Sequence, residues 1–330
     1  MTTGIAVIGC GIIGLSTSIL LLESGEEVTI YAADKHPQIS SSIACAIWLP
    51  ILVTDENRLS SEAISKYAYY AKASWEVYER QSNEPRYGIN WSRLHRLMRS
   101  EQVVPHYSSI VKNFRREKPL IINGEYDFEW SFDTFVIESP VYMQALYNDF
   151  IARGGKLIRR RFESIGDILS LPESIIFNCT GMGAKKLFSD EDLEPIKGQL
   201  IFHEPVNISH SISDGVFCVI PRSDALVLGT TYESSFSDLE ATETGLHLIW
   251  ENALNWLHHC HADTPFSQIQ ISKELIKTAQ AGIRPYRTTG IRIEAEIYND
   301  KIIVHNYGHG GSGYTYSWGT AKQAIGLMSI

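Results

Sequence analysis

The sequence lacks a dense cluster of basic residues, and this argues against nucleic acid as a partner. It has 29 Lys and Arg against 38 Asp and Glu, which gives a formal net charge of −9. Binding to a phosphate backbone depends on clustered positive side chains. The basic run from Arg159 to Arg161 is short and is typical of the solvated end of a strand. We therefore expect no nucleic-acid partner.

Paired cysteines and long apolar runs are also missing. The five cysteines are widely scattered, their number is odd, and no Cys-x-x-Cys pattern joins any of them. This usage suits a reducing compartment. No apolar run is long enough to cross a bilayer, and no signal-peptide pattern precedes the first predicted strand. We therefore expect a cytoplasmic protein without a membrane partner.

The sequence offers no convincing set of metal ligands. Its densest cluster, "HHCH" from His258 to His261, comes at the end of an amphipathic helical pattern, where histidine complements the helix dipole. Four neighbours in sequence cannot all converge on one ion. We predict no metal site.

Linkers and repeats are absent as well, although the chain is long enough for two domains. At 330 residues, with 44% hydrophobic and 20% charged residues, it has an ordinary globular composition. No internal repeat and no Pro/Ser-rich segment divides it. We therefore expect two domains between which the chain crosses repeatedly.

What the sequence does have is a βαβ unit at its beginning. "IAVIGCGIIGLSTSILLLESGEEVTIYAAD" predicts a strand, a glycine turn, an apolar helix and a second strand from Glu27 to Tyr31. The turn carries Gly9, Gly11 and Gly14 in the spacing Gly-x-Gly-x-x-Gly. In this context the pattern indicates a dinucleotide pyrophosphate at the helix N-terminus.

The acidic residue that commonly binds the ribose in such a unit is out of register here. Ala32 and Ala33 occupy its usual places, and Asp34 is the nearest candidate. A solvated turn residue is the alternative for Asp34. The βαβ unit alone is compatible with either a nicotinamide or a flavin dinucleotide.

Helical and strand patterns continue along the chain. A helix is predicted over 59–81, and a second one from Ser139-Pro140 to the stop at Gly154-Gly155. Strands 156–162 and 174–181 resume the βα alternation, so 52–136 resembles an insertion. Strands around 215–221 and 225–233 predict a hairpin, and a capping box at 237–240 predicts the start of an amphipathic helix.

The stretch "IIVHNYGHGGSGYTYSWGTA", residues 302 to 321, combines five glycines with two histidines and four tyrosines or tryptophans around a predicted turn. Glycines at 308, 310, 311 and 313 allow positive φ and a close approach of the backbone. This pattern favours a ligand pressed against the main chain. A strained strand-to-helix turn is the alternative.

Together with "SSSIACAIWLP", "NCTG" at 178 to 181 and "AGIRPYR" at 281 to 287, this stretch resembles the D-amino-acid oxidase family of FAD enzymes. The motifs follow the family's order over nearly the whole chain. The resemblance therefore favours flavin over nicotinamide. It implies noncovalent FAD, because no His or Cys is placed for a covalent link.

The resemblance also implies residues for the substrate. Arg284 is similar to the family arginine that grips the substrate carboxylate, a task suited to a planar guanidinium that is always charged. Gly311 matches the position whose carbonyl holds the amine, and Tyr232 matches an active-site tyrosine. Cys218 stands where the family usually has another tyrosine.

For the cofactor, the βαβ unit and the resemblance together imply contacts along several segments. They begin with the glycine turn and its helix, and they include the two serines that correspond to phosphate-binding threonines, the backbone after them, an adenine-side phenylalanine and the C-terminal loop. These residues are Gly9, Gly11, Ile12, Ile13, Gly14, Asp34, Ser40, Ser41, Cys45, Ala46, Ile47, Phe162, Thr180, Gly310, Ser312, Gly313, Tyr314 and Thr315. A helix beginning near Thr315 would aim its positive end at the flavin.

Two departures from the family concern the substrate. The long lid loop of vertebrate members is missing, because "SISDGVFCVIP" is too short for it. A thiol at Cys218 is smaller than a phenol and a weaker donor, so bulky apolar D-amino acids are expected over acidic ones. Arg222 lies close in sequence and is the nearest second arginine.

The implied fold is α/β, with a Rossmann-like FAD-binding domain and an interleaved α+β substrate domain. The expected division is 1–51, 137–196 and 278–330 for FAD, and 52–136 and 197–277 for the substrate. The implied function is oxidative deamination of D-amino acids by hydride transfer to flavin N5, with O2 as the acceptor and 2-oxo acid, ammonia and hydrogen peroxide as the products. A glycine, sarcosine or secondary-amine oxidase, or a non-catalytic nicotinamide sensor, is the alternative. A homodimer is left open.

Overall fold

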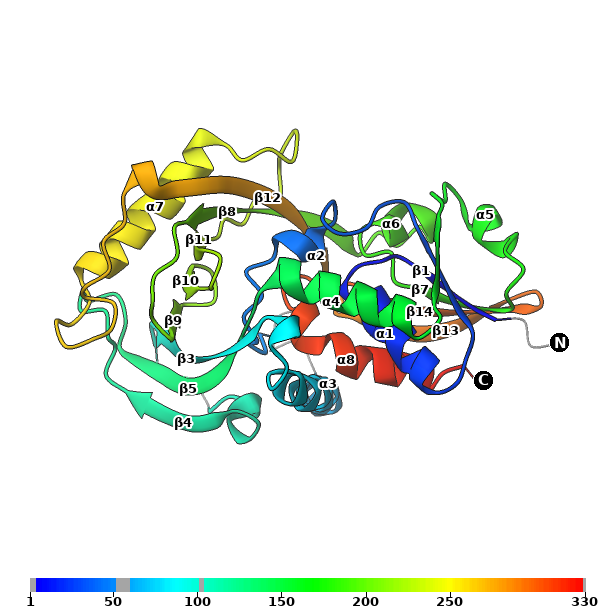
Figure 1. Cartoon of the computed structure of the whole chain (residues 1–330), viewed down its shortest axis with the longest axis horizontal. Coiled ribbons are helices and arrows are strands. Elements are labelled where there is room, and N and C mark those ends of the chain that lie inside the picture. Colours follow the sequence, from blue (N-terminus) through cyan, green and yellow to red (C-terminus); the bar gives the residue numbers. More distant parts are fainter. Residues whose placement is uncertain (1–3, 52–59, 101–103, 329–330) are drawn as a thin grey trace.

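The computed structural model describes residues 4–51, 60–100 and 104–328, and their strands form two sheets at opposite ends of the molecule (Figure 1). The first sheet has six strands in the order β13-β14-β7-β1-β2-β6. The second has eight strands in the order β12-β8-β11-β10-β9-β3-β5-β4. This mixed α/β architecture confirms the fold class expected from the sequence.

The six-stranded sheet is parallel apart from its edge strand β13. It consists of β1 (Ile5–Ile8), β2 (Val28–Ala32), β6 (Lys156–Arg159), β7 (Ile175–Asn178), β13 (Arg292–Tyr298) and β14 (Lys301–Tyr307). Strands buried on both faces are apolar throughout, as β1 is. Because parallel strands end at the same edge, the turns after β1, β7 and β14 meet there.

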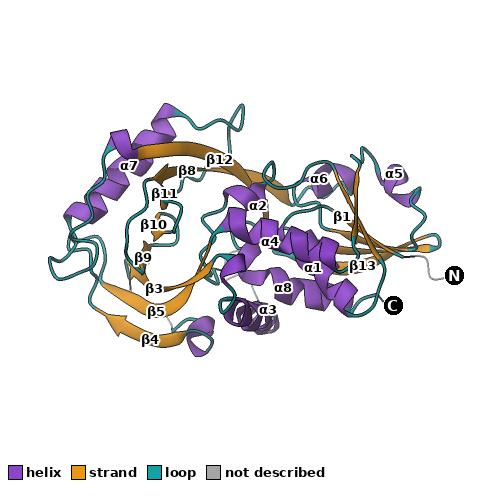
Figure 2. Cartoon of the chain, in the orientation of Figure 1, coloured by secondary structure: helices purple, strands orange, loops and turns teal. Residues whose placement is uncertain are grey.

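Helices pack beside this sheet and join the two ends of the molecule (Figures 1 and 2). The longer ones are α1 (Ile12–Glu23), α3 (Ser61–Gln81), α4 (Ser139–Ala152) and α8 (Gly313–Ile325), whereas α7 (Glu243–His258) lies on the other sheet (Figure 1). Short helices are α2 (Ser40–Ile43), α5 (Ile165–Leu169) and α6 (Gly183–Leu187). The buried Tyr78 hydroxyl of α3 donates to the Tyr314 carbonyl at 2.8 Å, which fastens α3 to α8.

The eight-stranded sheet is antiparallel except for the pair β3 and β9. It contains β3 (Ile89–Met98), β4 (Lys112–Glu117), β5 (Phe128–Ile137), β8 (Leu193–His203), β9 (His210–Ser213), β10 (Cys218–Pro221), β11 (Leu226–Gly229) and β12 (Ile276–Arg287). Helix α7 covers one face with the apolar side chains of Ile249, Trp250 and Ala253. The other face packs in part against Ile43, Cys45 and Ile47 of the segment after β2.

Most elements expected from the sequence are present with small shifts. The helix opened by Ser139-Pro140 and the hairpin β10-β11 are confirmed, and β2 runs one residue later than expected. The helix expected over 59–81 runs from Ser61, and residue 59 lies outside the described residues. The division into two domains stays a prediction.

The prediction that a capping box at 237–240 starts a helix was wrong. Helix α7 begins at Glu243, and the Thr242 hydroxyl caps it by accepting from Gly245 N at 3.2 Å. Thr242 is fixed in turn by Gln199, whose Oε1 accepts from Thr242 N at 2.7 Å. This long-range bond to β8 selects the start of the helix over the local motif.

In the described part of the chain, none of the helices is both long and apolar enough for a membrane span. The same residues contain no group of three or more His, Cys, Asp or Glu side chains placed to hold a metal ion.

Candidate active site

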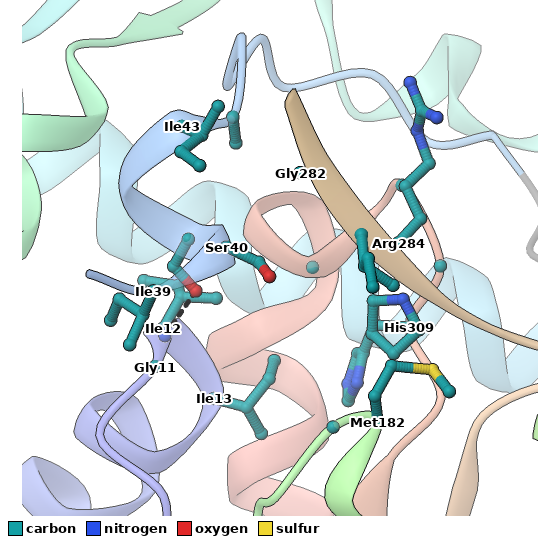
Figure 3. Close-up of a pocket in the computed structure, with 18 of the residues that line it drawn as sticks. Gly11, Ile12, Ile13, Ile39, Ser40, Ile43, Met182, Gly282, Arg284 and His309 are labelled. Atoms are coloured by element: carbon teal, nitrogen blue, oxygen red, sulfur yellow. Dashed lines mark hydrogen bonds between the residues drawn. The ribbon is translucent and has the colours of Figure 1, made fainter. Parts of the chain in front are cut away.

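A cavity of about 860 Å³ lies between the carboxyl edge of the six-stranded sheet and the face of the eight-stranded sheet opposite α7. Pockets of this size commonly hold a cofactor or ligand. Figure 3 shows Gly11, Ile12 and Ser40 on one side of it and Arg284 and His309 on the other. Every candidate site residue proposed from the sequence lines this cavity except Gly14.

The glycine turn after β1 has no room for side chains. Gly9 has φ +111°, and a Cβ there would lie 2.4 Å from the Cys179 carbonyl oxygen. A Cβ on Gly14 would lie 2.0 Å from the Gly9 carbonyl oxygen. Gly14 does not line the cavity itself. Its lack of a side chain lets α1 pack against the turn, and this packing brings the helix N-terminus to the cavity.

The segment after β2 closes over this helix N-terminus. Ile12 N donates to Ser41 Oγ at 3.1 Å, and the Ser41 carbonyl accepts from the Tyr314 hydroxyl at 2.5 Å. Ala46, with φ +53°, follows, and its carbonyl accepts from Ile137 N at 2.8 Å. Ser40, Ser41 and the backbone of 45–47 are thus held along one wall.

Asp34 and Phe162 lie at the β2 end of the cavity. The Asp34 carboxylate is 3.3 Å from Arg161 Nη2 and is partly exposed. Phe162 is buried against Tyr31, with ring centroids 6.1 Å apart. Asp34 is therefore an ion-paired residue at the cavity rim. That Asp34 binds the ribose of the cofactor stays a prediction.

The C-terminal glycine loop lies against the strand that carries Arg284. Gly310 N donates to the Pro285 carbonyl at 2.9 Å, and Gly308 and Gly310 both have positive φ. Helix α8 begins at Gly313, two residues before the expected position. Its N-terminus opens on the cavity.

Two candidates of this loop use their side chains inside the protein. The Tyr314 hydroxyl is bonded to the Ser41 carbonyl, and the Thr315 hydroxyl lies 3.2 Å from the Leu49 carbonyl.

His309 Nε2 lies 3.0 Å from the Thr320 hydroxyl, and burial lowers the pKa of His309 to about 3. A neutral, hydrogen-bonded His309 is thus a structural residue.

Arg284 is held from three sides at the other wall. Its Nη1 donates to the Thr231 carbonyl at 3.1 Å and its Nη2 to the Thr230 hydroxyl at 2.8 Å. The guanidinium carbon lies 4.2 Å from the ring centroid of Tyr232. A Cβ on Gly198 would come within 2.4 Å of Nη1, so the opposite strand leaves a slot for this group.

Gly311 completes this arrangement. A Cβ built on it would lie 3.4 Å from Arg284 Cδ and 3.8 Å from the Tyr232 hydroxyl oxygen. The three residues proposed to bind substrate therefore meet in one place, although they come from β12, the segment after β11 and the loop before α8.

Cys218 lies on the same sheet face, and its Sγ donates to Cys45 Sγ at 3.8 Å. Arg222, the nearest second arginine in sequence, lies outside the cavity lining. Its Nη2 and Nε are bound to the Asp224 carboxylate at 2.5 and 2.8 Å. Arg222 is therefore held in an ion pair with Asp224.

Two residues near the cavity were missed from the sequence. Arg96 of β3 lies opposite Ser213 of β9 in the register of the sheet. A Cβ on Gly215 would lie 2.2 Å from Arg96 Nη2. Its Nη1 is buried without a hydrogen-bond partner in the described chain. Asn306 lines the cavity, and neither of its buried amide atoms has such a partner. The position of Arg96 near the cavity follows only from the register of β3 against β9. The alternation of side chains along β3 in the sequence does not show which face of the strand is turned toward the cavity.

Comparison with known proteins agrees with this geometry. The family model described as FAD dependent oxidoreductase matches residues 4–327. The chain is 31% identical to a D-amino-acid oxidase of Dictyostelium discoideum, covering 98% of this chain and 90% of that one. It is 26% identical to human D-aspartate oxidase, with 99% and 95% covered.

Among solved structures, a glycine oxidase from Bacillus cereus shares the fold with a TM-score of 0.74 at 15% identity, and 98% and 94% of the two chains are covered. At this identity the likeness concerns the fold alone. The match of the family model over almost the whole chain is decisive: this chain belongs to the family of FAD dependent oxidoreductases.

Proposed function

We propose that this protein is an FAD-dependent oxidase that deaminates D-amino acids to 2-oxo acids. The observation that carries the proposal is the meeting of Arg284, Tyr232 and Gly311 at the wall of the cofactor cavity. A fixed guanidinium beside an exposed backbone suits a ligand with a carboxylate and an amine on one carbon. The related D-amino-acid oxidases support this substrate class.

The residues present fit FAD. The glycine turn and the N-terminus of α1 offer backbone N-H groups to a pyrophosphate, and a Cβ at Gly9 would displace this turn by clashing with the Cys179 carbonyl oxygen. The unpartnered amide of Asn306 is a further polar contact on the same cavity. The N-terminus of α8 opens on this cavity and would favour negative charge on a cofactor bound there. When bound, FAD accepts the hydride at N5 and passes electrons to O2.

The chain's own part in the reaction is to position the substrate. Arg284 would bind the carboxylate with the N-H groups that Thr230 and Thr231 leave free, and the Gly311 carbonyl would accept a hydrogen bond from the amine. Two fixed points of this kind would leave the Cα hydrogen in one defined direction. Orientation of this kind supplies most of the rate in such a site.

The cavity lining supports a reaction without a carboxylate or histidine base at Cα. Asp34 and His309 are the acidic residue and the histidine among the described residues that line it. Asp34 is ion-paired with Arg161, and His309 is buried against Thr320. A neutral substrate amine requires no such base, because the hydrogen leaves as hydride.

An oxidase of glycine, sarcosine or another secondary amine is the second candidate. Cys218 in place of a tyrosine and the short segment before it favour this alternative, and the glycine oxidase with the same fold is compatible with it. The family match argues against a non-catalytic nicotinamide sensor.

Two measurements test the proposal. A visible spectrum of the purified protein should show bound oxidised flavin, and acid precipitation should leave the yellow colour in the supernatant, because the cofactor is noncovalent. Peroxide formation should then be measured with D-amino acids, their L-enantiomers, glycine and sarcosine. Turnover of glycine and sarcosine alone would select the second candidate, and no turnover of any of them would overturn both.

We also propose a cytoplasmic location, because the five cysteines are free, and O2 as the physiological acceptor. Cross-linking or light scattering of the FAD-loaded protein would decide between a monomer and the homodimer.

A further inference from the structure

Two of the five cysteines lie side by side on the cavity wall. Cys45 follows helix α2 and Cys218 begins β10, so they are 173 residues apart in sequence. Their sulfur atoms are 3.8 Å apart and both side chains line the cavity that also holds Arg284 and Gly311. Neither is bonded to another cysteine in this structure.

The surroundings of the pair favour a reactive sulfur on Cys45. The Cys218 thiol donates to Cys45, and Arg284 and Arg222 contribute positive charge, so the pKa of Cys45 lies below its ordinary value. The same contact and burial raise the pKa of Cys218. A thiolate, not a thiol, is the nucleophile in reactions with peroxide.

The other three cysteines are in the opposite situation. Burial raises the pKa of Cys10 to about 11 and that of Cys179 and Cys260 to about 12. Cys10 and Cys179 line the same cavity, so access alone does not distinguish the pair. Cys45 differs from them in having both a charged neighbourhood and a second thiol within reach.

The proposed reaction, on which this inference builds, releases hydrogen peroxide inside this cavity. We propose that Cys45 and Cys218 form a peroxide-sensitive pair, which the enzyme's own product converts into a reversible intramolecular disulfide that slows turnover. The chemistry needs no reagent beyond peroxide and a later reductant.

The two steps balance as follows. The Cys45 thiolate attacks one peroxide oxygen, the O-O bond breaks, and Cys45 becomes a sulfenic acid while hydroxide leaves. The released hydroxide takes the proton of Cys218 and becomes water. The Cys218 thiolate then attacks the Cys45 sulfur, the S-O bond breaks, and the S-S bond forms while hydroxide leaves. The two sulfurs are oxidised by two electrons in all, and the peroxide is reduced to water. A dithiol reverses the change.

Disulfide formation would disturb the site because both sulfurs are anchored. The sulfurs must close from 3.8 Å to about 2.05 Å. Cys45 lies between two bound carbonyls: Ala44 accepts from the Ser139 hydroxyl and Ala46 from Ile137 N. Cys218 is paired with Ser213 on one side and Gly229 on the other. The closure therefore pulls the proposed flavin-binding segment toward the substrate wall.

The first test uses the FAD-loaded protein and added hydrogen peroxide, so it does not depend on the substrate. After treatment and alkylation, mass spectrometry of a non-reducing digest should show a peptide that joins Cys45 to Cys218, and dithiothreitol should remove it. Cys45→Ser and Cys218→Ser should lack this peptide, whereas Cys179→Ser, from the same cavity, should retain it. Absence of the joined peptide in the wild type would overturn the inference.

The second test follows activity, with each variant compared with its own initial rate. The wild type and Cys179→Ser should lose at least half of their rate in peroxide and recover it in dithiothreitol, and catalase should prevent the slower loss during turnover. Cys45→Ser should keep its rate. Equal loss in Cys45→Ser, or a joined peptide without loss of rate, would refute the regulatory role. If no substrate is turned over, the proposed function fails while the first test still decides the disulfide.

Discussion

Substitution of Arg284 by alanine tests the substrate site most directly. A guanidinium has five N-H groups, and Arg284 uses one on the Thr231 carbonyl and one on the Thr230 hydroxyl. Three remain, which is enough for two parallel bonds to a carboxylate. Losing a buried, charge-assisted pair of bonds costs about 3 to 5 kcal/mol. We expect kcat/KM for a D-amino acid to fall on the order of 10²- to 10⁴-fold.

The assay is steady-state peroxide production by Arg284→Ala, with Arg284→Lys as the matched control. Lysine keeps the charge but lacks the two-point geometry, so its loss should be intermediate. The flavin absorbance per protein should be unchanged in both. An amine of the same skeleton without a carboxylate should react equally with the wild type and Arg284→Ala. Near-normal kcat/KM for the D-amino acid in Arg284→Ala, with full flavin absorbance, would show that another residue holds the carboxylate.

Three further outcomes are expected. Cys218→Tyr should narrow the substrate profile, raising KM for D-phenylalanine more than for D-alanine, because the filled wall tolerates little added volume; an unchanged rank order would place Cys218 away from the substrate. Arg96→Met should raise KM for D-aspartate more than for D-phenylalanine, because it removes a positive charge behind Gly215; an equal effect on both substrates would show that this charge does not reach the pocket. The lowered pKa of His309, about 3 when folded, means that only the unfolded state binds this proton below pH 6.5, so stability is full above that pH and falls as the pH drops toward 3. Urea unfolding of the FAD-loaded protein at pH 7.5, 6 and 5 should show a shallower decline in His309→Gln, and equal slopes would contradict this.

The sequence was most informative where a local pattern coincides with a steric requirement. The turn at Gly9 and the loop at Gly310 require positive φ and a close approach of the backbone, so their glycines are visible without a structure. The helix from Ser139 could be predicted because proline in the first turn is a local signal, although the expected N-cap, Ser139, is the first residue of the helix and Glu138 precedes it as the N-cap. The capping box at 237–240 is an equally local pattern, but it does not mark the start of α7. The start is set by hydrogen bonds between Thr242 and Gln199, which lies on the distant strand β8.

Contacts between distant segments could not be read from the sequence. That Cys45 and Cys218 touch depends on the position of the segment after α2 against β10. The place of Arg96 depends on the parallel pairing of β3 with β9 in an otherwise antiparallel sheet. The internal use of the Tyr314 and Thr315 hydroxyls was hidden too, because a family motif gives residue identity but not side-chain direction.

The bond between Gly310 N and the Pro285 carbonyl has a consequence for how this enzyme could diversify. It joins the carboxylate anchor and the glycine loop into one frame, so the spacing between the invariant end of a substrate and the redox partner is fixed by main-chain atoms. The wall formed by β9 and β10 lies outside that frame. Substitutions at Ser213, Cys218 or Ile220 can therefore reshape the space for a side chain while the reacting geometry is inherited unchanged.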